Sequence, residues 1–284
     1  SKAQIQRTLK KLGLPFSEES LQDVKDLIKE KLDFYKRQPL ASDWFAIFID
    51  AYWGKLRDSE SGHLQDISVY IALGIDLKGF KHILGFWVLN GKESKAFWIE
   101  VLQDLINRGL HRVLLFITDD FKGLTEVISK LFPYAKHQLC LIHLQRNLRA
   151  KLSRKFYRTV KELFRRLKMS RDLDEGKLHF EALCQEVEKE FPDWAKVLRQ
   201  KQYHYLAFLE YPEEVRKHIY STNPVESLNA GLEKMCLELG GYFPSLEALE
   251  VNIFIQVVNL QDKWWRRAVP SIQSVSYLIQ QKFA

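Results

Sequence analysis

Two short apolar runs that each end in a carboxylate decide the fold of this chain: WFAIFID at residues 44–50 and VLLFITD at residues 113–119. Runs of this length and composition predict buried strands of a sheet. Each strand would carry its acid, Asp50 or Asp119, to the edge where ligands of open α/β sheets gather. A third acid, Glu226, stands in STNPVESLN at residues 221–229, where we expect a helix. Three such carboxylates predict a site for divalent metal and nucleic acid.

The sequence around the two runs predicts the rest of the sheet. Residues 69–75 and 82–89 are rich in β-branched and aromatic side chains, and a turn-rich link at residues 76–79 joins them as a hairpin. With the Asp50 run they form an antiparallel meander. We then expect a helix over 93–108, the Asp119 strand, a helix over 124–132 and a short strand over 136–139. This is the RNase H-like order, so the predicted fold class is α/β with a mixed five-stranded sheet and flanking helices.

Composition limits the class of protein. The chain has 284 residues, of which 46% are hydrophobic, enough for a large core. Its longest apolar runs fall well short of the roughly 20 residues that a membrane helix needs, and no secretory signal pattern opens it. Three cysteines without a CxxC pair argue against a disulfide framework. We therefore expect a cytoplasmic protein with no membrane partner. The net charge of +7 fits a polyanion partner, but it fits many other soluble proteins too.

The two ends of the chain read as helical. Before residue 42, apolar residues recur at helical spacing, with Ser17 as an expected N-cap. This segment is either the remnant of a DNA-reading module or a helical hairpin packed on the next domain. From Leu141 onward the pattern is amphipathic, and residues 141–168 carry a basic stripe with few acids. The stripe is either a solvated helix face or a surface for phosphate; its position beside the three acids favours phosphate.

An ordered set of motifs resembles the Mutator-type bacterial insertion-sequence transposases. The set covers nearly the whole chain, and its order is far more specific than any one piece. Its members are DAY at 50–52 with KLR at 55–57, VYIALGI at 69–75, LGFW at 84–87, ES at 93–94 with FW at 97–98, Asp119 with KGL at 122–124, QLCLIH at 138–143 with RN at 146–147, TN at 222–223 with ESLN at 226–229, and FP at 243–244.

The resemblance implies an RNase H-like domain interrupted by an all-helical insertion, with the third acid on a helix after the insertion. The expected division is residues 1–42 as a helical remnant of an N-terminal DNA-binding region, 43–140 as the first part of the catalytic domain, 141–221 as the insertion and 222–284 as the final helices. The implied activity is that of a DDE-type transposase, which cleaves transposon ends and joins the 3′-hydroxyl to target DNA.

The resemblance also assigns roles to residues. Asp50 would bridge two Mg²⁺ ions, for which Mn²⁺ could substitute, and Asp119 and Glu226 would each complete one ion. Asp119 is favoured over Asp120 because the family's single acid stands four places before the Gly of the Lys-Gly pair; Asp43, Asp58 and Asp76 are read as turn or surface acids. No zinc is expected, and Cys140 and His143 have a structural or DNA-positioning role. The residues expected to contact DNA are Lys122, Arg146, Arg149, Lys151, Arg154, Lys155, Asn223 and Asn229.

Several alternatives stay open at this point. Aromatic residues of the insertion either hold a flipped base or fill the core; the candidates are Trp194, Tyr203, Tyr205 and Phe208. After Asn229 only Lys234 remains of the basic residues that the family usually carries there. The chain is therefore either a nucleoid-associated transposase, acting as a homodimer on terminal inverted repeats and target DNA, or a catalytically impaired DNA-binding derivative. A nuclease for RNA hybrids or junctions is a third class.

Overall fold

The computed structural model describes residues 21–283. The expected cap at Ser17 and the part of the expected helical segment that precedes it lie outside these residues. A five-stranded sheet forms the centre, in the order β3-β2-β1-β4-β5. Its strands are β1 (Asp43–Arg57), β2 (Leu64–Ile75), β3 (Lys81–Leu89), β4 (Arg112–Thr118) and β5 (Lys136–Leu139). The pairs β1–β2 and β2–β3 are antiparallel, while β1–β4 and β4–β5 are parallel. The predicted RNase H-like mixed sheet is confirmed.

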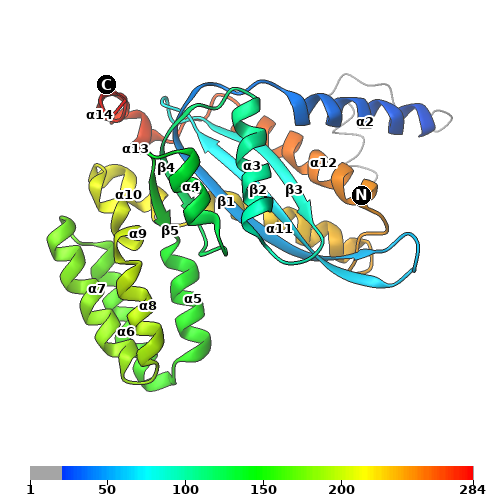
Figure 1. Cartoon of the computed structure of the whole chain (residues 1–284). Helices are drawn as coiled ribbons and strands as arrows, with labels where there is room; N and C mark the ends of the chain where they lie inside the picture. The colour runs from blue at the N-terminus through cyan, green and yellow to red at the C-terminus, as the bar shows by residue number, and fades with distance from the viewer. Residues whose placement is uncertain (1–20, 284) are drawn as a thin grey trace.

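The first hairpin is longer than its apolar runs predict. β1 continues past Asp50 to Arg57, and β2 begins at Leu64, so that a two-stranded arm extends from the sheet (Figure 1). The outer part alternates exposed and buried residues and leaves Trp53 exposed. Its end is held by α11 and by Phe243, whose backbone pairs with Lys55 and Arg57. Backbone pairing therefore extends the strands beyond the point where apolar burial ends.

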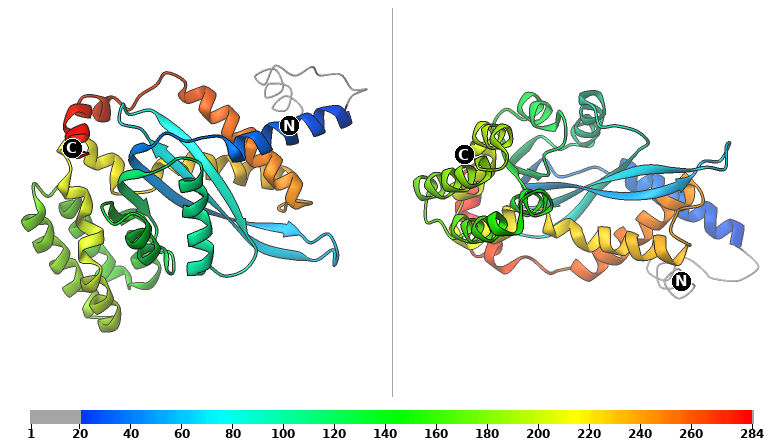
Figure 2. Two further views of the ribbon diagram at one scale, coloured as in Figure 1. Left: turned by 45° about the horizontal axis from the view of Figure 1, so that its top comes forward. Right: turned by 90° about the horizontal axis from the view of Figure 1, so that it is seen from below.

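Helices cover both faces of the sheet. On one face, α3 (Lys95–Asn107) and α4 (Leu124–Leu131) bury a cluster around Trp98 and Tyr70. On the other, α11 (Asn223–Glu238) lies along β1, and α12 (Leu246–Trp264) lies against β3 and α2 (Leu21–Arg37), as Figures 1 and 2 show. The hydroxyl of Tyr35 on α2 donates to the carbonyl of Ile83 at 2.6 Å. The segment Leu21–Arg37 is thus anchored on the sheet domain.

Between β5 and α11 the chain is helical throughout. The elements are α5 (Leu141–Lys151), α6 (Arg154–Lys168), α7 (Leu173–Glu188), α8 (Pro192–Gln200), α9 (Gln202–Leu206), the 3-10 turn η2 (Ala207–Glu210) and α10 (Glu213–Ile219). They form a bundle at one end of the sheet (Figure 1). Two short helices, α13 (Pro270–Gln273) and α14 (Ser276–Gln281), end the described chain. Among residues 21–283 no helix has both the length and the apolar character needed to cross a bilayer.

One buried amide joins this bundle to the sheet. Gln138 on β5 is fully buried; its Oε1 accepts a hydrogen bond from the Phe208 backbone at 2.8 Å, and its Nε2 donates to the Tyr205 carbonyl at 3.1 Å. A buried amide with both ends satisfied fixes the register of the two segments that it joins. The bundle therefore has a defined position on β5, the strand next to β4, which Asp119 follows directly.

Candidate active site

Asp50 is the buried centre of the candidate site. Its side chain leaves β1 toward α11, where Asn229 Nδ2 donates to Asp50 Oδ2 at 3.0 Å. His143 Nε2 on α5 lies 4.0 Å from Asp50 Oδ1. Only 5% of Asp50 is exposed, and this desolvation, with smaller contributions from Asp119 and Glu226, raises the pKa of Asp50 to about 6. The nearby His143 lowers this pKa, but by less than burial raises it, so a further cation would stabilise the charged carboxylate.

Asp119 stands beside Asp50 because of the strand register. Ile49 of β1 pairs with Thr118 of β4 in parallel, so Asp50 and Asp119 are the next residues on neighbouring strands, which run about 4.8 Å apart. Asp119 Oδ1 accepts the backbone N–H of Asp120 at 2.7 Å. Asp120 itself forms an ion pair with Lys201 on the helical bundle. The structure therefore gives the two adjacent acids different neighbours.

Glu226 enters from the first turn of α11, where the positive end of the helix dipole stabilises an acid. Its Oε1 accepts a hydrogen bond from Arg146 Nη2 on α5 at 2.8 Å. Within residues 21–283 no group of three or more His, Cys, Asp or Glu side chains is arranged to hold a metal ion. Glu226 lies close enough to influence the pKa of Asp50, but its carboxylate is held by Arg146 in this conformation.

Cys140 and His143 connect the site to both helices. Cys140 caps α5, and its sulfur accepts hydrogen bonds from the backbone N–H groups of His143 and Thr222, at 3.5 and 3.4 Å. Desolvation works to lower the pKa of His143, but Cys140, Asp119 and Asp50 together raise it to about 9. The CxxH pair therefore joins the end of β5, the start of α5 and the residue before α11.

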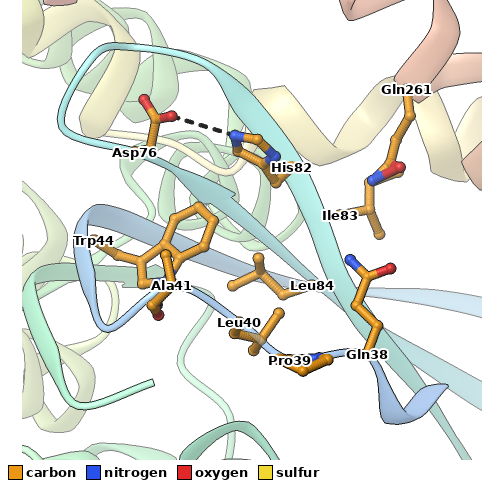
Figure 3. Close-up of a pocket in the computed structure, with 10 residues that line it drawn as sticks. All are labelled: Gln38, Pro39, Leu40, Ala41, Trp44, Asp76, His82, Ile83, Leu84 and Gln261. Atoms are coloured by element: carbon orange, nitrogen blue, oxygen red, sulfur yellow. Dashed lines mark hydrogen bonds and ion pairs between the residues drawn. The ribbon is translucent and has the colours of Figure 1, made fainter. Parts of the chain in front are cut away.

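The other acids considered from the sequence have separate contacts. Asp43 pairs with Arg112, Asp58 accepts from the backbone of the 58–63 turn, and Asp76 accepts from the backbone of Lys78 and Phe80 and pairs with His82. The Asp76–His82 pair belongs to a cavity of about 220 Å³ beside Trp44 (Figure 3). None of the three candidate metal ligands lines this cavity.

The candidate DNA contacts divide into three groups. Arg149, Lys151, Arg154 and Lys155 are exposed on α5 and α6 and form no salt bridge within the described part of the chain. Lys151 lies over the ring of Trp194, with its Nζ 4.8 Å from the centroid. Lys122 and Asn223 are exposed near Asp119 and Glu226 in sequence, whereas Arg146 and Asn229 are engaged with Glu226 and Asp50.

The aromatic candidates of the bundle have different surroundings. Tyr205 and Phe208 are buried in its core, as the packing interpretation predicts, and Trp194 is partly buried. Tyr203 is half-exposed and shares a cavity of about 330 Å³ with Tyr134 and His204. Only Tyr203 of the four has a ring that is substantially open to solvent.

Sequence reasoning did not assign a role to Glu93, which shapes the loop that carries Asp119. Its Oε1 accepts the hydroxyl of Tyr70 at 2.8 Å, and its Oε2 accepts the backbone N–H of Lys122 at 3.1 Å. Thr118 was also missed: its hydroxyl donates to the carbonyl of Asp119 and contacts His137 Nε2 at 2.8 Å. Neither role leaves a signal in residue spacing, because Glu93 meets Tyr70 and Lys122, and Thr118 meets His137, only in the folded chain.

The sheet order, the two acids on neighbouring parallel strands and the third acid on α11 define a protein of the RNase H-like class. The comparison with family models gives the family: residues 1–267 match the model "Transposase, Mutator family". The chain belongs to this family of transposases.

Curated relatives agree with this assignment. The chain is 32% identical over 265 residues to "Transposase for insertion sequence element ISRM3" of Rhizobium meliloti, covering 93% of this chain and 65% of that protein. It is 30% identical over 254 residues to a probable insertion-sequence transposase of Corynebacterium diphtheriae, covering 89% of this chain and 73% of that protein. The chain therefore spans about two thirds of the length of these relatives.

A solved structure also aligns with the chain. It is the "Drosophila P element transposase strand transfer complex", which covers 94% of this chain and 79% of its own, at 12% identity and a TM-score of 0.31.

Proposed function

We propose that the chain is the catalytic part of a DNA transposase that cleaves transposon ends with divalent metal and transfers the freed 3′-hydroxyl into target DNA. One observation carries the proposal. A desolvated carboxylate, Asp50, stands beside Asp119 on the next parallel strand and within electrostatic range of Glu226, in a chain of the Mutator family. Asp119 and Glu226 both disfavour the charged form of the buried Asp50, so the arrangement favours a ligand of opposite charge.

The residues suit hard divalent cations. The proposed ligands, Asp50, Asp119 and Glu226, offer carboxylate oxygens, the donors that Mg²⁺ and Mn²⁺ prefer. Asn229 Oδ1 is a further hard oxygen; it is buried and has no hydrogen-bond partner, and such an atom is costly unless something binds it. When bound, two divalent ions would activate the attacking oxygen and stabilise charge on the leaving oxygen.

The chain's own side chains prepare this site. Asn229 holds one oxygen of Asp50 and leaves the other facing His143. Burial of Asp50 excludes water, which strengthens its interaction with any cation. Arg146 is placed to exchange its carboxylate partner, Glu226, for a phosphate oxygen of DNA, because a guanidinium binds either group in a similar geometry.

Exposed cations on α5 and α6 supply the proposed DNA surface. Arg149, Lys151, Arg154 and Lys155 continue from Arg146 along these helices without neutralising acids. Phosphate neutralisation by such residues gives affinity that does not depend on sequence. Joining two transposon ends requires at least two protomers, so we propose that the protein acts as a homodimer on DNA.

The test compares nicking of supercoiled plasmid by the chain and by its Glu226→Gln variant, in Mg²⁺ and in Mn²⁺. Asp120→Asn is the matched control, because it also neutralises one acid in the site region but the Lys201 ion pair holds that acid. Metal-dependent nicking that Glu226→Gln abolishes and Asp120→Asn retains supports the proposal. Nicking that survives in Glu226→Gln contradicts the assignment of the third acid.

A second function has a specific observation in its favour. Glu226 is bound by Arg146, and the acids are not gathered into a metal-binding group within the described chain. A DNA-binding derivative that no longer catalyses the reaction could keep Glu226 paired with Arg146 and the acids apart, because it would not need to bind a metal ion. It would bind plasmid with the same affinity in all three proteins and nick it in none.

A further inference from the structure

A second cationic site lies away from the acids. A cavity of about 310 Å³ opens where α12 ends and α13 begins, with Lys81 of β3 in its wall. Lys81, Lys263 and Arg267 bring three cations to it, and His218 of α10 adds an imidazole. The remaining wall is mostly apolar and comes from Ile75, Pro224, Trp264, Ala268, Val269 and Pro270.

The three cations are not neutralised. In the described chain none of Lys81, Lys263 and Arg267 forms a salt bridge with an acid. Desolvation, and then the charge of Lys263, lower the pKa of Lys81. Desolvation, and then Lys217 and Lys81, lower the pKa of His218. Positive groups that destabilise one another in a partly desolvated cavity would be stabilised by an anion.

The backbone holds the cations in place. The N–H of Val269 donates to the carbonyl of Gly79 at 2.9 Å, which fixes the chain after α12 to the β2–β3 turn. Gly79 has a φ of +88°, and a Cβ there would meet the Val269 carbonyl at 3.3 Å. Lys81 Nζ lies 5.1 Å from the centroid of the Trp264 ring. The turn, the end of α12 and the cation on β3 therefore form one assembled unit.

Local backbone strain marks the same segment. Arg266, next to Arg267, has a φ of +57° and is the one non-glycine residue with a positive φ in residues 21–283. This conformation is unfavourable for a residue with a side chain, and such conformations concentrate at functional positions. Here it lies immediately before the residue that brings the third cation to the cavity.

We propose that this cavity binds a phosphate group. Two ammonium groups and one guanidinium match the charge and the oxygen geometry of a phosphate. The volume admits a phosphate with the sugar attached to it. The cavity is linked to the candidate active site through Pro224, which lines the cavity and stands in the first turn of α11, as Glu226 does. The phosphate therefore belongs to a DNA backbone that continues past the start of α11; this identification of the source rests on the proposed function.

The experiment uses the full chain and two matched double variants. Lys263→Ala with Arg267→Ala removes two exposed cations of the cavity. Lys130→Ala with Lys177→Ala removes the same charge from exposed positions that are already paired with Glu126 and Asp174. Affinity for a duplex of arbitrary sequence is measured by fluorescence anisotropy over a salt series in EDTA, which prevents cleavage. Thermal unfolding of each protein checks that it is folded.

The expected result is a smaller salt dependence in the cavity variant alone. Each phosphate contact contributes a slope of about 0.9 in log affinity against log salt, so the slope should fall by about 1 to 2 in that variant and stay unchanged in the control. Equal slopes in the cavity variant, the control and the intact chain would overturn DNA as the source of the phosphate.

Calorimetric titration with inorganic pyrophosphate tests the phosphate site independently of the proposed function. Binding to the intact chain and the control, with loss in the cavity variant, supports the phosphate site even if the chain binds no DNA. In that case the source is a small phosphorylated molecule. Absence of pyrophosphate binding to the intact chain, together with unchanged salt slopes, would reject the site itself.

Discussion

Arg146 should compete with metal for the third acid. Arg146 Nη2 lies 2.8 Å from Glu226 Oε1, and the two side chains are 58% and 43% exposed. An ion pair with this exposure contributes about 0.2–1 kcal/mol. A divalent ion that takes Glu226 as a ligand has to break this pair first. Arg146→Ala should therefore tighten Mn²⁺ binding by about 1.4-fold to fivefold, since 1.4 kcal/mol corresponds to a factor of ten.

Arg165 provides a closely matched control. Its Nη2 lies 2.7 Å from Glu162 Oε1, with side chains 62% and 46% exposed, but the pair is on α6 and includes none of the candidate metal ligands. Mn²⁺ affinity, measured by calorimetry without DNA, should change in Arg146→Ala and not in Arg165→Ala. Equal affinity in Arg146→Ala and the intact chain, or weaker affinity in Arg146→Ala alone, would refute the competition.

Three other predictions concern stability and the support of Asp50. Desolvation, and then His204, lower the pKa of the buried His137 to about 3. His137 therefore binds a proton near pH 6.5 in the unfolded chain but not in the folded chain, so its contribution to the free energy of unfolding falls as the pH falls. Between pH 7 and pH 5 this contribution falls by about 2 kcal/mol. Asp50 and His143, whose pKa values are raised, act in the opposite direction in both proteins. Urea unfolding should therefore show that the change in stability from pH 7 to pH 5 is about 2 kcal/mol less favourable in the intact chain than in His137→Gln, and an equal change in both would exclude His137 as the cause. Trp98→Ala should lower the free energy of unfolding by about 3–5 kcal/mol, since Trp98 is fully buried between the sheet and α4; the exposed neighbour Ile99 should tolerate alanine within about 0.5 kcal/mol in the same urea titration, and similar costs at both positions would contradict the packing argument. Asn229→Ala should weaken Mn²⁺ binding about 10- to 100-fold in a calorimetric titration, because Asn229 orients Asp50; unchanged affinity would show that Asp50 needs no such support.

The sheet could be predicted from the sequence because its signals are local. The apolar runs before Asp50 and Asp119 are continuous, and the turn at residues 76–79 carries the residues that such a turn needs. The positions where the strands end could not be predicted in this way. β1 reaches Arg57 because its backbone pairs with β2 and with Phe243, and such pairing leaves no apolar pattern in the sequence. Pairing partners distant in the chain determine where these strands stop.

The side-chain geometry of the site could not be predicted in the same way. The apolar runs predict that Asp50 and Asp119 each end a strand; Asp119 directly follows the last residue of β4, whereas Asp50 lies in the middle of β1. The pairing of Arg146 with Glu226 depends on how α5 is placed relative to α11. The same limit applies to Tyr203 and Tyr205, two residues apart, of which one is half-exposed and the other buried. Tertiary packing decides such differences in exposure, and the apolar periodicity of a helix does not predict them.

Asp50 allows the most direct test of the central claim, that these acids form a metal-dependent site that cleaves DNA. The measurement is the nicking rate of supercoiled plasmid by the intact chain and by Asp50→Asn in Mg²⁺, with DNA affinity recorded on the same samples. We expect nicking by the intact chain, a loss in the variant beyond the roughly 10- to 100-fold that changes around a metal ligand cost, and unchanged affinity for DNA. Equal nicking rates in the two proteins would contradict the account.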